Sequence, residues 1–246
     1  MRVRLVYEVE ARDDEFLLEE ETMPETPIHD QAIQLLVLLL QAWAARVGRD
    51  VLVARNLACR TDPADVRRGV DPDVCVIEPP PPDLDTLTQL RLWEPGHVAP
   101  WLAIEVVSES TADKDYQKAP VSYARLGTQE LWIFDPKREG VGEMGGPYRV
   151  QVWRRERDRM ERVYAGEGPA WSEGLGAWLV VVDGGRKLRL AGDEAGTQLW
   201  PTAAEQERAE RERAEARAAQ AQTERERAEA EVAELRHRLA ALERQR

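Results

Sequence analysis

Two acidic residues stand in or beside apolar runs, where charged side chains are unusual. In the segment 101–107 alternate residues belong to opposite faces, as in a β-strand, and Glu105 interrupts one of two otherwise apolar sets. Asp73 immediately precedes a second apolar run, 74–77. A buried carboxylate is costly unless it has a partner, a proton or a metal ion. Two carboxylates at the ends of neighbouring strands therefore predict a site for a hard divalent cation, Mg²⁺ or Mn²⁺.

Further titratable residues lie close to these two acids in the sequence. Asp71 precedes Asp73 by two positions, on the same side of an extended chain, and is an alternative ligand. After Glu105 the chain passes through a polar segment into an expected helix that carries Asp115 and Lys118. His29 stands at the start of another expected helix, where a turn or capping role is the simplest interpretation.

The order and spacing of the motifs resemble a known family. The chain is similar to the Uma2 family of restriction-endonuclease-like proteins, a branch of the PD-(D/E)xK nuclease superfamily, over residues 15–200. The resemblance is carried by Pro72-Asp73-Val74, by 104–111, by Asp115 and Lys118, and by 123–127 and 130–136.

The resemblance implies a chemistry for these residues. Asp73 and Glu105 would bind one Mg²⁺ or Mn²⁺, with help from the main-chain carbonyl of Val106. Lys118 would act as the base or as the cation that stabilises the transition state. Asp115 would contact the metal ligands without binding the metal itself. The resemblance also favours a place for His29 in the lining of the metal site. The expected activity is Mg²⁺-dependent hydrolysis of DNA phosphodiester bonds by an endonuclease.

The lysine is where this chain departs from its relatives. In the superfamily a lysine follows the strand acid by two positions, but that position holds Val107. In the Uma2 family the basic residue comes from the next helix, four positions after an aspartate, which here is Ala119. Lys118 is one residue early, a rotation of about 100° on a helix. Pro120 would permit the helix start to slip, because proline breaks a regular helix interior.

The elements that must position these residues predict an α+β fold, with a restriction-endonuclease-like central mixed sheet flanked by helices. A length of 246 residues and a hydrophobic content of 43% are sufficient for a packed core. We expect a nuclease-like domain over 1–200 and a charged helix over 201–246. Periodicity predicts a helix over 28–47, strands over 51–59, 74–77, 101–107 and 131–134, paired strands over 148–154 and 160–164, and a hairpin over 177–190.

The C-terminal segment consists almost entirely of Ala, Glu and Arg, a composition typical of a long helix supported by ion pairs. Val232, Leu235, Leu239 and Leu242 fall at the a and d positions of heptads, whereas earlier heptads place alanine and arginine there. Two interpretations remain open, a coiled coil that forms a homodimer and a lone solvated helix.

The formal charge of −12 counts against nucleic-acid binding, which usually rests on a basic surface. Residues 205–246 contain 10 Arg and 11 Glu, so a net charge of −11 remains on 1–204. A local basic cleft with a bound metal could still hold a phosphate. The alternative is a non-catalytic interaction protein that keeps the nuclease fold and dimerises through its C-terminal helix.

The sequence also bears on the compartment. No basic segment precedes an apolar stretch at the N-terminus, and the apolar run 35–40 is too short to span a bilayer, so we expect a cytoplasmic protein without membrane association. Cys59 and Cys75 lack the spacing of a zinc site.

Overall fold

The computed structural model describes residues 6–8, 26–140, 142 and 146–243. Its contacts divide the chain into two compact units, Met1–Trp200 and Pro201–Arg246. The acidic segment 13–25 lies outside the described residues, as do 141 and 143–145 of the glycine-rich segment 140–147.

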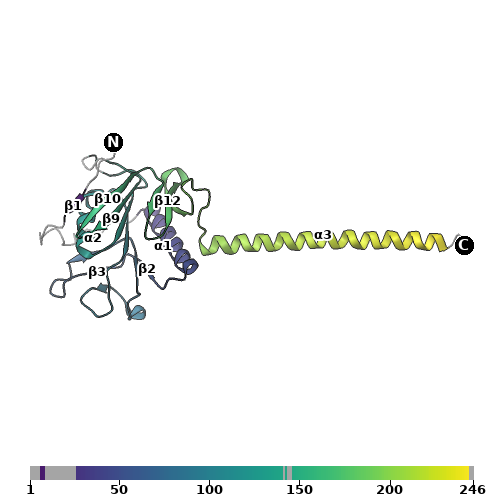
Figure 1. Ribbon diagram of the computed structural model, residues 1–246, viewed down its shortest axis with the longest axis horizontal. Helices are drawn as coiled ribbons and strands as arrows, with labels where there is room; N and C mark the ends of the chain where they lie inside the picture. Colours follow the sequence, from purple (N-terminus) through teal and green to yellow (C-terminus); the bar gives the residue numbers. More distant parts are fainter. Residues whose placement is uncertain (1–5, 9–25, 141, 143–145, 244–246) are drawn as a thin grey trace. The chain divides into compact units, whose positions relative to one another are not determined.

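A mixed sheet forms the centre of the first unit (Figure 1), and this confirms the predicted α+β class. Within the described ranges the sheet has seven strands in the order β1-β10-β9-β8-β7-β5-β2. Strand β7 pairs in parallel with β8, and the remaining pairings are antiparallel. The strands are β1 (Val6–Glu8), β2 (Leu52–Arg55), β5 (Val74–Ile77), β7 (Leu102–Val106), β8 (Glu130–Phe134), β9 (Val150–Glu156) and β10 (Arg159–Gly166).

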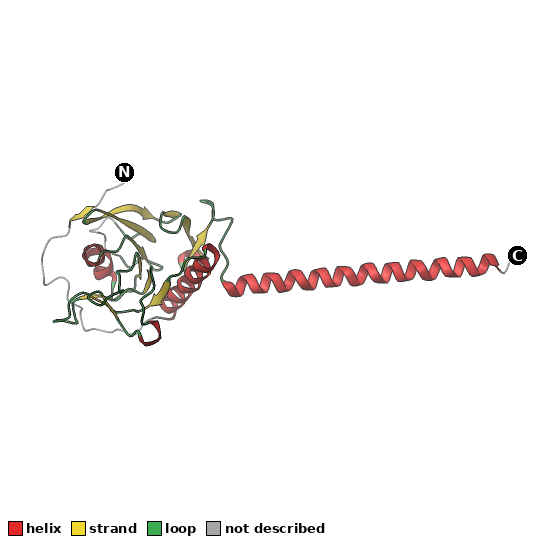
Figure 2. Cartoon of the chain, turned by 60° about the horizontal axis from the view of Figure 1, so that its bottom comes forward, coloured by secondary structure: helices red, strands yellow, loops and turns green. Residues whose placement is uncertain are grey.

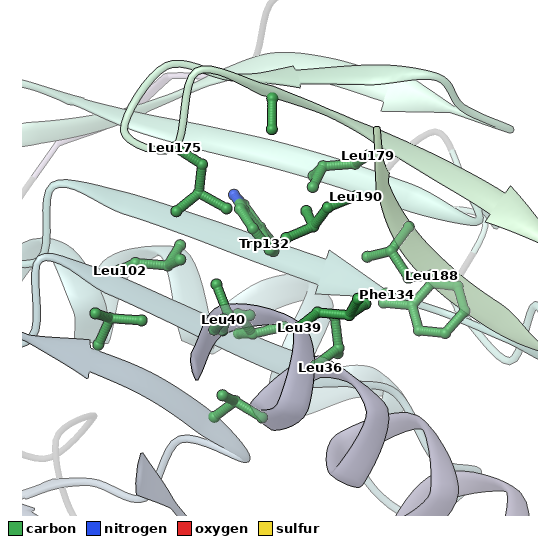
Figure 3. Packing of buried hydrophobic residues seen from close by; sticks show 14 of the residues in the cluster. Leu36, Leu39, Leu40, Leu102, Trp132, Phe134, Leu175, Leu179, Leu188 and Leu190 are labelled. Carbon is green, nitrogen blue, oxygen red and sulfur yellow. The ribbon is translucent and has the colours of Figure 1, made fainter. Parts of the chain in front are cut away.

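Both faces of this sheet are covered, which is why its central strands are apolar on both sides. One face packs against helix α1 (Pro27–Val47) and a small sheet of β11 (Ala170–Ser172), β12 (Ala177–Val182) and β13 (Lys187–Ala191). Figure 3 shows leucines of α1 meeting Phe134 of the central sheet and Leu188 of the small one. The expected hairpin over 177–190 is therefore present as β12 and β13.

The other face packs against helix α2 (Ala119–Leu126) and the π-helical turn η3 (Lys114–Lys118). A third sheet, with the order β4-β3-β6, contributes to the same cluster. Its strands are β3 (Cys59–Arg60), β4 (Gly69–Val70) and β6 (Leu90–Arg91), and short 3₁₀ turns lie at η2 (Leu84–Thr86) and η5 (Asp183–Gly185). Figure 2 shows these helices and strands by type.

Helix α1 begins and ends where local signals place it. The Thr26 hydroxyl accepts a hydrogen bond from the His29 backbone N–H at 3.4 Å, and Pro27 occupies the first turn, where its missing N–H costs nothing. Gly48 ends the helix at φ 68°, a conformation that glycine adopts without strain. The apolar run in this helix is buried against the sheet, and no helix of the described chain is long and apolar enough to cross a membrane.

One predicted strand is divided in the structure. The sequence predicts a single strand over 51–59, but β2 ends at Arg55. Asn56 then adopts a positive φ of 49°, which ends the extended backbone, and Cys59 pairs with Val70 in the third sheet. Strand propensity alone did not show this change of sheet.

The second unit is one long helix, α3 (Ala203–Glu243), as predicted. It starts with a reciprocal capping box, in which Thr202 N donates to Glu205 Oε2 at 2.8 Å and Glu205 N donates to Thr202 Oγ1 at 3.2 Å. Ion pairs one turn apart, such as Arg208–Glu212 at 3.0 Å, support its exposed surface.

Candidate active site

The two strand acids lie side by side at one end of β5 and β7. These strands are antiparallel with Val74 opposite Ile104, so Asp73, just before β5, is level with Glu105 near the end of β7. The Val106 backbone N–H donates to Asp73 Oδ2 at 2.6 Å. Sequence alternation predicted the acids and their strands, and the antiparallel register brings the acids together.

Glu105 is buried, with 3% of its surface exposed, on the sheet face that packs against α2. The Tyr123 hydroxyl of α2 donates to Glu105 Oε1 at 2.6 Å. Burial raises the pKa of the Glu105 carboxyl to about 8. The charge of Lys114 acts in the opposite direction, and those of Asp115 and Asp73 add to the increase in pKa. The buried position of Glu105 therefore disfavours the charged form of its carboxyl.

Asp115 is a third carboxylate of the same site. It is 1% exposed, and Thr111 Oγ1 donates to its Oδ2 at 2.6 Å. Burial raises the pKa of Asp115 to about 7, against the lowering effects of the Lys114 charge and the Thr111 hydrogen bond. Its Oδ1 has no hydrogen-bond partner among the described residues and lies 4.0 Å from Lys114 Nζ.

Lys114, which sequence reasoning did not select, is the cation that most affects these acids. The charge of Glu105 raises the pKa of Lys114 above its ordinary value; burial opposes this, and Asp115 and Asp73 add to it. Its side chain is 46% exposed, so solvent weakens the interaction. The signal in the sequence is a lysine directly before Asp115, in the first turn of the helix that follows the acidic strand.

The remaining predicted residues have different surroundings. Lys118 is the last residue of η3 and is exposed. Asp71, the alternative ligand, is 42% exposed in its side chain and pairs with Arg60 Nη1 at 2.6 Å. Arg60 is thus a partner of Asp71, and the charge of Asp71 also helps to raise the pKa of Lys114.

His29 reaches the site from the start of α1. Its Nε2 lies 2.6 Å from the Val106 carbonyl oxygen and 3.5 Å from Asp73 Oδ2. Because a carbonyl oxygen only accepts hydrogen bonds, Nε2 carries the proton in this arrangement. His29 therefore stands in the first turn of α1 and also lies beside Asp73 and the end of β7.

This donor set fits a divalent cation. Asp73, Glu105 and the Val106 carbonyl offer oxygen ligands, which Mg²⁺ and Mn²⁺ prefer. Four carboxylates, those of Glu105, Asp115, Asp73 and Asp71, act on the charge of Lys114. The raised pKa values of Glu105 and Asp115 reflect burial together with an excess of negative charge. A bound cation would relieve that excess.

A second acidic group contains Asp83, Glu94 and His97, whose ligand atoms lie within 4.8 Å of one another. The Arg91 backbone N–H donates to His97 Nδ1 at 3.1 Å, so the proton of a neutral ring is on Nε2. That Nε2–H lies 3.0 Å from Asp83 Oδ1 and donates to it. The ring therefore presents no free lone pair to a metal, and we interpret this group as a structural hydrogen-bond network.

Comparisons with known proteins assign this chain to a family. The model of the Uma2 family, described as "Putative restriction endonuclease", matches residues 9–172. A solved structure, that of a putative nuclease belonging to DUF820 from Anabaena variabilis ATCC 29413, is 18% identical with a TM-score of 0.43, over 67% of this chain and 76% of that one. No curated protein sequence matches. Because the family model spans more than half of the chain, the protein belongs to the Uma2 family of restriction-endonuclease-like proteins.

Proposed function

We propose that this protein is a metal-dependent endonuclease that hydrolyses DNA phosphodiester bonds at the Asp73–Glu105 site. The observation that carries the proposal is the position of these two acids, level on neighbouring antiparallel strands with a third carboxylate, Asp115, buried beside them. Membership of the Uma2 family supports DNA as the substrate.

The metal would be Mg²⁺ or Mn²⁺, held by Asp73, Glu105 and the Val106 carbonyl. When bound, such an ion polarises the scissile phosphate and lowers the pKa of an attacking water.

The chain's own contacts orient these ligands before any substrate arrives. The Val106 N–H holds Asp73 Oδ2, which leaves Oδ1 for a cation. The Tyr123 hydroxyl holds Glu105 Oε1 and leaves Oε2 in the same way. The His29 Nε2–H donates to the Val106 carbonyl oxygen and so fixes its orientation. Preorganised groups of this kind need little rearrangement during the reaction.

Charge also limits how DNA can bind. The net charge of −11 on residues 1–204 repels a phosphate backbone at long range. We therefore expect DNA binding to depend on the bound cation, whose positive charge acts on the phosphate at short range.

The test is cleavage of supercoiled plasmid and of single-stranded DNA with Mg²⁺ or Mn²⁺, and with EDTA as the metal-free reference. Glu105→Gln and Asp73→Asn keep the shape of each side chain and remove its charge, so each variant should lower the cleavage rate by about 100-fold or more. The matched control is Glu109→Gln, an exposed acid four residues after Glu105, which should stay within about twofold of wild type.

Two results would count against the proposal. Cleavage that survives Glu105→Gln would place the activity elsewhere or in a contaminant. A folded wild-type protein that binds Mn²⁺ but cleaves neither substrate would favour the alternative function, an interaction protein that keeps the nuclease fold.

A further inference from the structure

The two positions at which the resemblance described above would place a lysine, 107 and 119, hold apolar residues that are packed away from solvent. Val107, two residues after Glu105, is 2% exposed in the cluster beneath α2. Ala119, four residues after Asp115, is 3% exposed in the same cluster. Neither position can supply a positive charge, so the site needs its cation from another residue.

The helix that follows β7 contains an irregularity at this point. The Ala119 N–H donates to the Lys114 carbonyl five residues earlier, which is the π-helical pattern of η3. In a regular α-helix the ring of Pro120 would clash with the Tyr116 carbonyl four residues before it. The wider π turn directly before Pro120 relieves that clash. The proline thus accounts for the irregular turn in physical terms.

Tyr116 fixes this turn against the sheet. Its side chain is fully buried, and its hydroxyl lies 3.0 Å from Asp135 Oδ2 and 2.9 Å from the Tyr148 carbonyl. It also accepts a hydrogen bond from the Tyr148 N–H at 3.0 Å. The N-terminal end of the turn, which carries Lys114 and Asp115, is therefore held beside the end of β7.

We propose that Lys114, and not Lys118, is the catalytic lysine of this site, placed there by the π-helical turn. The inference rests on the proposed function and names the residue that would contact the scissile phosphate. Lys114 Nζ lies 4.0 Å from Asp115 Oδ1 at the first residue of the turn, and its charge acts on the buried Glu105 carboxyl. Lys118 comes four residues later, at the far end of the same turn.

The surroundings of Lys114 define its role. The side chain of Asp115 is buried, whereas that of Lys114 is 46% exposed. Lys114 can therefore contact an incoming phosphate while it stays beside the carboxylates. The nearby carboxylates favour the ammonium form. Lys114 therefore acts as a fixed positive charge and hydrogen-bond donor toward the phosphate and does not remove a proton from water.

Cleavage assays on alanine variants distinguish the roles of the two lysines. Lys114 and Lys118 are the same residue type in the same turn, so each variant is a control for the other. Lys114→Ala should lower the rate by about 100-fold, and Lys114→Arg should restore part of it, since the charge is retained. Lys118→Ala is the matched control and should remain within about twofold of wild type. A loss in Lys118→Ala as large as that in Lys114→Ala, or normal cleavage by Lys114→Ala, would overturn the proposal.

A second measurement does not depend on activity. At pH 8.5, Mg²⁺ titrated into Lys114→Ala by calorimetry should bind about tenfold more tightly than to wild type, because a competing positive charge is gone. Lys118→Ala should bind as wild type does. Unchanged affinity in Lys114→Ala would show that this lysine does not face the carboxylates. If wild type binds Mg²⁺ and cleaves nothing, the nuclease function fails, and the affinities still decide which lysine faces the site.

Discussion

At the scale of single residues, the site is a set of acids in surroundings that oppose their charge. Glu105 is surrounded by apolar neighbours and one tyrosine hydroxyl, and Asp115 is buried with an unbonded carboxylate oxygen among the described residues. A protein keeps such groups against a cost in stability when they have a function. We propose that this function is cation binding, since a divalent ion would compensate the charges that the core does not.

The destabilising effect of these buried charges should make the stability of the metal-free protein depend on pH. Glu105 has a pKa of about 8 in the folded chain against an ordinary value of 4.5, so folding favours its protonated form. The stability from this protonated carboxyl is complete below pH 4.5 and is lost as the pH rises through 8. In EDTA, the Tm of wild type should therefore fall between pH 5 and pH 9, and Asp115, with a pKa of about 7, should contribute in the same direction.

Glu105→Gln removes this charge and should stay folded to a higher Tm than wild type at pH 8.5, by about 5 °C. Thermal melts in EDTA across the pH range measure the difference, and Glu109→Gln should follow wild type throughout. Identical pH profiles for wild type and Glu105→Gln would mean that the Glu105 carboxyl is well solvated.

At the scale of elements, the connection between β7 and β8 decides the geometry of the site. These two strands are parallel, so the chain must cross from the end of one to the start of the other, and η3 and α2 make that crossing over the sheet face. The site acids lie on β7 and just before β5, whereas Lys114 and Asp115 lie on the crossing segment. The position of η3 is therefore as important to the site as the strands.

Tyr116→Phe should loosen η3 while keeping the buried ring. The lost hydrogen bonds to Asp135 and Tyr148 should cost about 1–2 kcal/mol of unfolding free energy, a fall in Tm of about 3 °C. Cleavage should fall by about tenfold, because Lys114 and Asp115 are less well held.

The control for this variant is Tyr164→Phe. Tyr164 belongs to β10 and not to η3, and its hydroxyl accepts a hydrogen bond from the Gly168 N–H at 2.8 Å. This variant should lose similar stability but retain cleavage. Equal activity in both variants, measured alongside their melting curves, would show that the hydroxyl of Tyr116 stabilises the fold without positioning the site.

At the scale of the whole molecule, we predict that α3 joins two copies of the chain. Val232 and Leu235 are 45% and 56% exposed, and with Leu239 and Leu242 they continue an a and d pattern over two heptads. Glu210 precedes Arg211 and Glu224 precedes Arg225, so in a parallel pair each arginine at an a position has a glutamate beside it at the g position.

The double variant Val232→Arg, Leu235→Arg should therefore convert a dimer into a monomer. Light scattering coupled to size-exclusion chromatography measures the mass directly. The control variant Ala230→Arg with Ala233→Arg adds the same charges to the same turns, but at positions outside the a and d pattern. It should leave the dimer intact. A monomeric wild type over the micromolar range would support a lone solvated helix.

Most of the fold was predictable because its signals are local. Alternation over 101–107 predicted β7 with Glu105 among apolar neighbours, and helical periodicity over 28–47 predicted α1. Composition alone predicted α3. The strand over 51–59 was predicted wrongly as one element, because the change of sheet at Asn56 depends on pairing with distant β4 and not on propensity.

The sequence by itself determined the family, the fold class and the identity of the strand acids, since strand period, motif order and helix composition are written in neighbouring residues. Only the tertiary structure decided which charges meet. It paired Asp71 with Arg60, buried Asp115, and brought Lys114 Nζ to 4.0 Å from an Asp115 oxygen in the π turn ahead of Pro120. The physical reason is that electrostatic interactions depend on distance and burial, and both are set by the packing of η3 on the sheet.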